Sequence, residues 1–340
     1  MSRLRRISIA AVLLTAAACG SKPSPGPTGP SGPPPQIVCG ADVSVGGLGP
    51  TQLLSYAAPA VTSGVAPVTT TCTPASGGAF PVGTTTVTCV ATDAIGQSAS
   101  CSLSARVVAP LIGAPKFEAV GDSLTQGQNG LPIQPTFIDE PNSYPTKLRA
   151  LLTGAFPNQG LTLVNRGFGG QFVAETRDAL PNYLAADRPE VVMLLAGYND
   201  LTGPCRAGTT VEAPACDAAV EHVEDTLREC VRIIKPFSTV RYVFVGLLTP
   251  SGPVAPNAER DLRIDPSAIQ SLNNRISAMA SSEGVYAVDL LTPFIGHEAE
   301  FVSIDGLHLR PAGYQAIADA FFARILAIVP RSQPSALSVR

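Results

Sequence analysis

Hydrophobic residues follow two different patterns along the chain. Between residues 37 and 108 they occupy alternate positions in short segments separated by glycine and proline. Cys101, Leu103, Ala105 and Val107, for example, alternate with serine and arginine. Alternation of this kind places the apolar side chains on one face of a strand. We therefore predict a small antiparallel β-sandwich here, with a hairpin that turns at residues 93–97.

From residue 116 the pattern changes. Short apolar runs now alternate with longer helical stretches, which is typical of a parallel sheet covered by helices. The predicted fold class of this part is α/β. The predicted strands are 117–120, 161–164, 191–196, 240–247 and 285–290, and the predicted helices are 144–152, 174–185, 215–234, 266–281 and 311–328.

Polar and glycine-rich motifs follow four of these predicted strands. Ser123 follows the first strand, Gly170 the second and Asn199 the third, while Asp305 and His308 come after the fifth. The carboxyl ends of parallel strands lie at one edge of a sheet, where ligands bind near the change in strand order. We therefore expect these residues to lie close together.

The motifs also resemble a known family. Gly121-Asp122-Ser123-Leu124, the segment 165–170, the segment 197–200 and Asp305-Gly306-Leu307-His308 occur in the order of the four sequence blocks of the SGNH (GDSL) hydrolase superfamily. The resemblance covers residues 116–330. It implies a flavodoxin-like three-layer αβα sandwich with a parallel sheet, and a serine esterase or lipase that needs no metal or organic cofactor.

The resemblance also implies a role for each motif residue. Ester hydrolysis needs a nucleophile, a base and donors for the oxyanion. Ser123 is the expected nucleophile, which forms an acyl-enzyme, His308 is the base, and Asp305 orients the imidazole. The expected oxyanion donors are the backbone N–H groups of Ser123 and Gly170 and the side-chain amide of Asn199. The family's glycine lies five residues after the asparagine of its block, which identifies Gly170.

Simpler explanations exist for the same residues. Asn199 could cap a helix, and Asp305 could bind its own loop. The domain could also bind a ligand without chemistry, as in an adhesin. Of the other two histidines, His222 is predicted to be a solvated surface residue and His297 to lie in a loop without a motif partner. Tyr198 is larger than the residue often found there in the family, so we expect it to narrow the pocket.

The segments 72–77, 80–83 and 87–93 resemble the hyalin repeat (HYR), an extracellular immunoglobulin-like module, here predicted for residues 37–110. Such a small exported domain is expected to need two disulfides. Four cysteines allow three pairings, and the sequence does not select one. The module could bind a cell-surface glycan or protein, but its few aromatic residues favour a stalk. The cysteines are Cys39, Cys72, Cys89 and Cys101.

The N-terminus indicates export. Three arginines precede the apolar segment 7–14, and Ala16-Ala17-Ala18-Cys19 resembles a bacterial lipobox. Residues 1–19 are therefore predicted to be a lipoprotein signal peptide with Cys19 as the lipidation site, although an ordinary secretory signal would look similar. Residues 20–36 form a predicted Pro/Gly/Ser linker, and residues 331–340 a tail. The expected location is the bacterial cell envelope, on its periplasmic or surface face, with the protein anchored in the membrane by lipid.

Composition narrows the function further. The chain has 340 residues, a net charge of −3 and no basic run, which argues against nucleic-acid binding. The expected partner is an ester substrate, whether a lipid, an acetylated glycan or a small ester.

The remaining cysteines lie in the predicted α/β part. Cys205 and Cys216 either form a disulfide near the sheet edge that carries the motifs or remain unpaired thiols. Cys230 is expected to be a buried hydrophobic residue.

Overall fold

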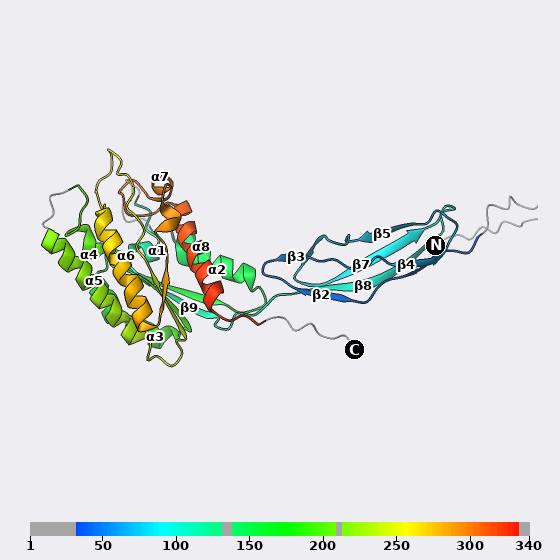
Figure 1. Ribbon diagram of the computed structural model, residues 1–340, viewed down its shortest axis with the longest axis horizontal. Helices are drawn as coiled ribbons and strands as arrows, with labels where there is room; N and C mark the ends of the chain where they lie inside the picture. The colour runs from blue at the N-terminus through cyan, green and yellow to red at the C-terminus, as the bar shows by residue number, and fades with distance from the viewer. Residues whose placement is uncertain (1–31, 131–137, 209–212, 333–340) are drawn as a thin grey trace, which may run out of the picture.

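The computed structural model describes residues 32–130, 138–208 and 213–332. Its elements form two groups, which we call the β region (residues 36–108) and the α/β region (residues 116–328) (Figure 1). The predicted signal peptide at residues 1–19, with Cys19, lies outside the described residues. Within the described residues, no helix has the length and apolar character needed to cross a membrane.

The β region is an immunoglobulin-like arrangement of mostly antiparallel strands. Its hairpin joins β7 (Gly83–Thr92) to β8 (Ser98–Val108) and turns at the predicted place. The hairpin is the centre of a four-stranded sheet in the order β2 (Val43–Gly46), β8, β7, β5 (Thr69–Thr73), and two strand pairs complete the region: β1 (Gln36–Val38) with β4 (Ala60–Ser63), and β3 (Thr51–Leu53) with β6 (Ala79–Pro81).

Two disulfides hold this region together. The structure selects one of the three possible pairings, Cys39–Cys101 and Cys72–Cys89. Cys89 lies on the strand between the other two, and the strand register places it opposite Cys72 on β5 and opposite Cys101 on β8. Its disulfide is with Cys72. The prediction of two disulfides is confirmed.

The α/β region is built on a five-stranded parallel sheet. The strands run in the order β10 (Thr162–Gly167), β9 (Lys116–Gly121), β11 (Val191–Leu195), β12 (Tyr242–Gly246), β13 (Tyr286–Val288). This is the flavodoxin-like order, in which the chain crosses from one side of its first strand to the other. The predicted fold class is therefore confirmed.

Helices cover both faces of this sheet, so the region has three layers. Figure 1 shows α2 (Tyr144–Ala155) and α8 (Pro311–Ile328) on one side, and α3 (Val173–Asp187), α5 (Ala213–Ile234) and α6 (Pro266–Glu283) on the other. Each long helix and strand was predicted, with bounds that differ by a few residues. The short elements were not, because too few residues reveal a period: α1 (Ser123–Gln126), α4 (Tyr198–Thr202), α7 (Glu298–Phe301), η1 (Glu140–Asn142) and η2 (Thr292–Phe294).

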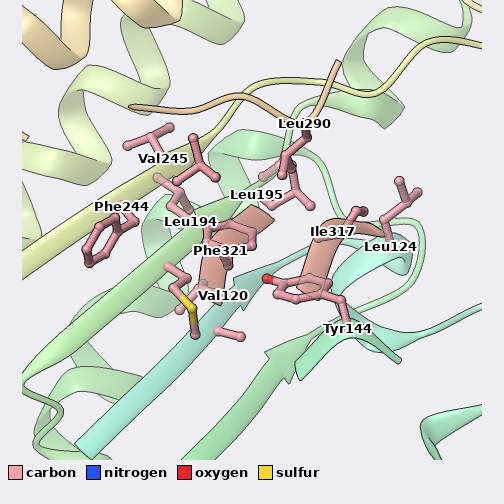
Figure 2. Close-up of a cluster of buried hydrophobic side chains, with 14 of the residues drawn as sticks. Val120, Leu124, Tyr144, Leu194, Leu195, Phe244, Val245, Leu290, Ile317 and Phe321 are labelled. Atoms are coloured by element: carbon pink, nitrogen blue, oxygen red, sulfur yellow. The ribbon is translucent and has the colours of Figure 1, made fainter. Parts of the chain in front are cut away.

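The core lies between the sheet and the helices. Figure 2 shows Val120 and Leu194 from the central strands beside Tyr144 and Phe321, which come from α2 and α8. The rings of Tyr144 and Phe321 stack with their centroids 5.3 Å apart. Strand β11 is buried along its whole length, as expected for a central strand covered on both faces. The carboxyl ends of these strands are thus held on a rigid base.

One charged residue breaks the apolar pattern of the central strand. Glu118 on β9 is 0% exposed, and neither of its carboxylate oxygens has a hydrogen-bond partner among the described residues. Burial raises the pKa of Glu118 to about 7, and the neighbouring charge of Asp187 acts in the same direction.

Candidate active site

The sharp turn after β9 places Ser123 at the edge of the sheet. Gly121 is required there, because a Cβ atom at this position would lie 1.9 Å from the carbonyl oxygen of Leu195. Asp122 then caps α1 by accepting the N–H of Leu124 at 3.0 Å. Ser123 is the first residue of α1, and its side chain lines a cavity at the end of the strands.

His308 and Asp305 reach the same cavity from the loop before α8. His308 Nε2 lies 2.9 Å from Ser123 Oγ, and His308 Nδ1 lies 2.6 Å from Asp305 Oδ2. The other carboxylate oxygen of Asp305 accepts the N–H groups of Leu307 and His308 at 3.1 and 3.0 Å. Serine, histidine and aspartate therefore form one hydrogen-bonded chain, and the aspartate is fixed by its own loop.

The two buried aspartates near Ser123, Asp305 and Asp122, have pKa values that are shifted in opposite directions. Burial acts to raise the pKa of Asp305, but the hydrogen bond and charge of His308 and the two N–H groups outweigh it, so this pKa lies below its ordinary value. Burial raises the pKa of Asp122 to about 7, since its hydrogen bond with Leu124 and the charge of His308 compensate only in part. Asp305 is thus the carboxylate that is ionised across the neutral range.

Gly170 and Asn199 line the same cavity as Ser123. The N–H groups of Ser123 and Gly170 have no hydrogen-bond partner among the described residues. Asn199 Nδ2 donates one hydrogen to the carbonyl oxygen of Gln171 at 3.0 Å, and an amide nitrogen carries a second. The structure thus brings the predicted donors and the serine to one place.

The family comparison agrees with this geometry. Residues 119–316 match the model of the GDSL-like Lipase/Acylhydrolase family. The chain belongs to this family. A GDSL-like lipase/acylhydrolase is an ester-hydrolysing enzyme, so the α/β region is the part of this chain that hydrolyses esters. Residues 33–107 match the HYR domain, which agrees with the disulfide-linked β region.

Solved structures with a similar fold come from several sources. A gut microbial diltiazem-metabolizing enzyme has a TM-score of 0.51 and 16% identity, over 64% of this chain and 48% of that chain. An α/β hydrolase from the metagenome of Lake Arreo, Spain, has a TM-score of 0.47 and 25% identity, and an acetylxylan esterase from Geobacillus stearothermophilus has a TM-score of 0.47 and 19% identity. Both alignments cover 63% of this chain and 95% of the other. No curated protein sequence matches the chain.

The remaining expectations about this GDSL-like hydrolase can be compared with the structure. His222 is exposed on α5, as predicted, and His297 is the residue directly before α7, with its Nδ1 3.4 Å from Glu300 Oε2. The expectation for Tyr198 was wrong. Its side chain is fully buried, its hydroxyl accepts the N–H of Thr249 at 2.8 Å, and it does not line the cavity.

The cavity has a volume of about 300 Å³. Its lining includes polar side chains that the sequence did not single out, among them Gln128, Thr202 and Arg260. These three residues belong to no recognised motif, and only the folded loops bring them to Ser123. A disulfide between Cys205 and Cys216 closes the loop that follows Thr202, and it resolves the alternative left open by the sequence.

Proposed function

We propose that this GDSL-like hydrolase cleaves carboxylic esters through an acyl-enzyme on Ser123. The supporting observation is the continuous chain of hydrogen bonds from Ser123 Oγ through His308 to Asp305. A nucleophile in contact with a base, which is in turn oriented by a carboxylate, is the arrangement that acyl transfer requires. The division into a signal peptide (1–19), a linker (20–36), an HYR-like domain (37–110) and a hydrolase domain (115–330) is part of this proposal.

The chemistry follows from the contacts. His308 Nε2 takes the proton of Ser123 Oγ as that oxygen attacks the ester carbonyl. The N–H groups of Ser123 and Gly170 and the free N–H of the Asn199 amide stabilise the oxyanion. His308 then gives the proton to the leaving alcohol. Water, deprotonated by His308, attacks the acyl-enzyme; the bond to Ser123 Oγ breaks, His308 returns the proton to that oxygen, and the acid is released. Ionised Asp305 stabilises the imidazolium in both half-reactions.

The cavity favours a short acyl group. Its volume of about 300 Å³ is at the lower end of the range for ligand sites, and its lining combines glycine, polar and charged residues with only three apolar ones, Ala258, Leu262 and Ile304. We therefore infer that activity falls as the acyl chain grows, and that a small ester or an acetylated glycan suits the site better than a long-chain lipid. A panel of esters that share one alcohol and differ in acyl length measures this preference.

Replacement of the nucleophile tests the proposal. Ser123→Ala is expected to lower turnover of short-chain activated esters by on the order of 10⁴–10⁶, because no nucleophile remains. Ser281→Ala, which removes an exposed hydroxyl on α6, is the matched control and should keep the wild-type rate. Equal rates in wild type and correctly folded Ser123→Ala would contradict the enzyme mechanism and favour the binding-only alternative.

Three disulfides and the HYR match indicate an extracellular protein, since disulfides persist in oxidising compartments. We further propose that a lipid on Cys19 anchors the enzyme to the membrane and that the β region acts as a stalk. Its two aromatic residues, Tyr56 and Phe80, are buried, so residues 33–108 present no aromatic binding surface.

Cell fractionation tests the anchor. Cys19→Ala is expected to move the protein to the soluble fraction or to leave an uncleaved precursor, because the lipid acceptor is lost. Processing of the variant with unchanged membrane association would show that Cys19 is not the anchor.

A further inference from the structure

The loop that carries Gly170 is held on both sides by side-chain hydrogen bonds. On the side of α1, Gln126 Oε1 accepts the N–H of Gly169 at 2.9 Å. On the other side, Asn199 Nδ2 donates to the carbonyl oxygen of Gln171 at 3.0 Å. Gly170 therefore lies between two anchored neighbours, and its own N–H is left without a partner among the described residues.

A second glutamine orients the first. Gln128 Nε2 donates to the same Gln126 Oε1 at 3.0 Å. An amide has one accepting and one donating end, so this bond fixes the oxygen of Gln126, rather than its nitrogen, toward Gly169. The main chain of Gln128 is itself held, because its N–H donates to the Ser123 carbonyl at 3.0 Å and its carbonyl accepts the hydroxyl of Tyr314.

The close fit of this pair explains the glycine at position 169. A Cβ atom there would lie 1.8 Å from Gln128 Nε2 and 2.8 Å from Gln126 Oε1. A side chain at position 169 would therefore displace the amide of Gln128 from its place beside Gln126. Gln126, Gln128 and Gly169 thus form a closely packed contact between the loop and α1, which we call the glutamine contact. Gln126 does not line the cavity that Ser123 lines.

We propose that Gln126 and Gln128 are positioning residues that hold the Gly170 N–H where the oxyanion forms. The inference rests on the proposed function, because it assigns these side chains a part in the same reaction. A hydrogen-bond donor stabilises the oxyanion only if it already points to the position where the oxyanion forms. Loss of the glutamine contact should therefore slow the chemical step without weakening substrate binding.

The test replaces Gln126 by methionine, which keeps the length of the side chain and removes the accepting oxygen. Gln126→Met is expected to lower kcat for a short-chain ester by about 10- to 100-fold and to change KM by less than about twofold. Gln270→Met, which removes an exposed glutamine on α6, is the matched control and should have the wild-type kcat. Thermal unfolding of both variants verifies that they are folded.

A double-mutant cycle separates positioning from direct substrate contact. Gln128 acts through Gln126, so Gln126→Met/Gln128→Met should have the same kcat as Gln126→Met alone. Effects that multiply, a loss confined to KM, or a kcat for folded Gln126→Met within twofold of wild type would each overturn the inference.

The same measurements distinguish this inference from the proposed function. If wild type hydrolyses the ester, Ser123→Ala does not, and Gln126→Met equals wild type, only the positioning role is wrong. If Ser123→Ala retains the wild-type rate, the proposed function fails and the positioning role fails with it.

Discussion

The β region and the α/β region are stabilised in different ways. The β region has a small core around Leu54, Phe80 and Val87, and two disulfides cross it. The α/β region buries a far larger set of apolar residues on both faces of its sheet, and its one disulfide joins Cys205, in the loop after α4, to Cys216 on α5. A small domain buries too little surface to be stable by packing alone, whereas a large one can use packing throughout.

This difference explains where buried charge is tolerated. In the β region the buried Asp93 is fully used in the hairpin turn, where it accepts the N–H groups of Ile95 and Gln97. In the α/β region Glu118 is buried without a hydrogen-bond partner among the residues that the structure describes, and Asp122 has a pKa raised to about 7. A large apolar core offsets the free-energy cost of burying these carboxyl groups.

Removal of disulfides in the two regions should have opposite consequences. Cys39→Ala/Cys101→Ala is expected to destabilise the β region by about 4 kcal/mol, because it opens a loop with a sequence separation of 62. Ester turnover should change by less than about twofold. Chemical denaturation monitored by hydrogen exchange measures the stability of the β region, and kcat/KM measures ester turnover in the same protein.

The loop disulfide is the matched comparison. Cys205→Ala/Cys216→Ala opens a loop with a separation of only 11, so stability should fall by less, about 3 kcal/mol. The loop adjoins Thr202 in the cavity, so kcat/KM should fall several-fold. Turnover that depends on Cys39–Cys101 and not on Cys205–Cys216 would contradict the assignment of chemistry to the α/β region.

The buried carboxyl group of Glu118 gives a smaller effect with a distinct pH dependence. Its folded-state pKa of about 7 is above the ordinary value of 4.5, so the folded protein keeps a proton that the unfolded chain loses. The free energy of unfolding should therefore fall as pH rises from about 4.5 to above 7. Glu118→Gln cannot ionise and should be more stable than wild type by on the order of 2–3 kcal/mol at pH 8, and by almost nothing at pH 4.

Glu221→Gln on the exposed face of α5 is the control and should follow the wild-type pH profile. If the free energy of unfolding of Glu118→Gln follows that of wild type at every pH, ionisation of the buried carboxyl group does not destabilise the folded protein.

Much of the fold could be predicted because it follows from period and topology. A short apolar run such as 191–195 between longer helical stretches is typical of a central strand. Parallel strands bring their carboxyl ends to one edge, which is why Ser123, Asn199 and His308 meet. The strand predicted at 161–164 ends at Gly167 instead, because Gly167 stays in register beside Gly121.

Other features depend on contacts that a linear pattern does not encode. The sequence did not choose among disulfide pairings, since each of the four cysteines lies on or beside a strand and the strand register places Cys89 opposite both Cys72 and Cys101. Only the folded side chains bond Cys89 to Cys72 and Cys101 to Cys39. Tyr198 was misplaced because its direction depends on Thr249, which lies far away in sequence. Gln126 and Gln128 carried no signal, since their role exists only where α1 meets the glycine loop.

The histidines provide the most direct test of the central claim that Ser123, His308 and Asp305 act as one unit. His308→Ala should lower turnover nearly as far as Ser123→Ala, and the double variant should be no worse, since two parts of one proton-transfer unit do not add. His222→Ala and His297→Ala should stay within a few-fold of wild type, because both histidines are exposed and lie outside the cavity. An active His308→Ala beside an inactive His297→Ala would contradict the account.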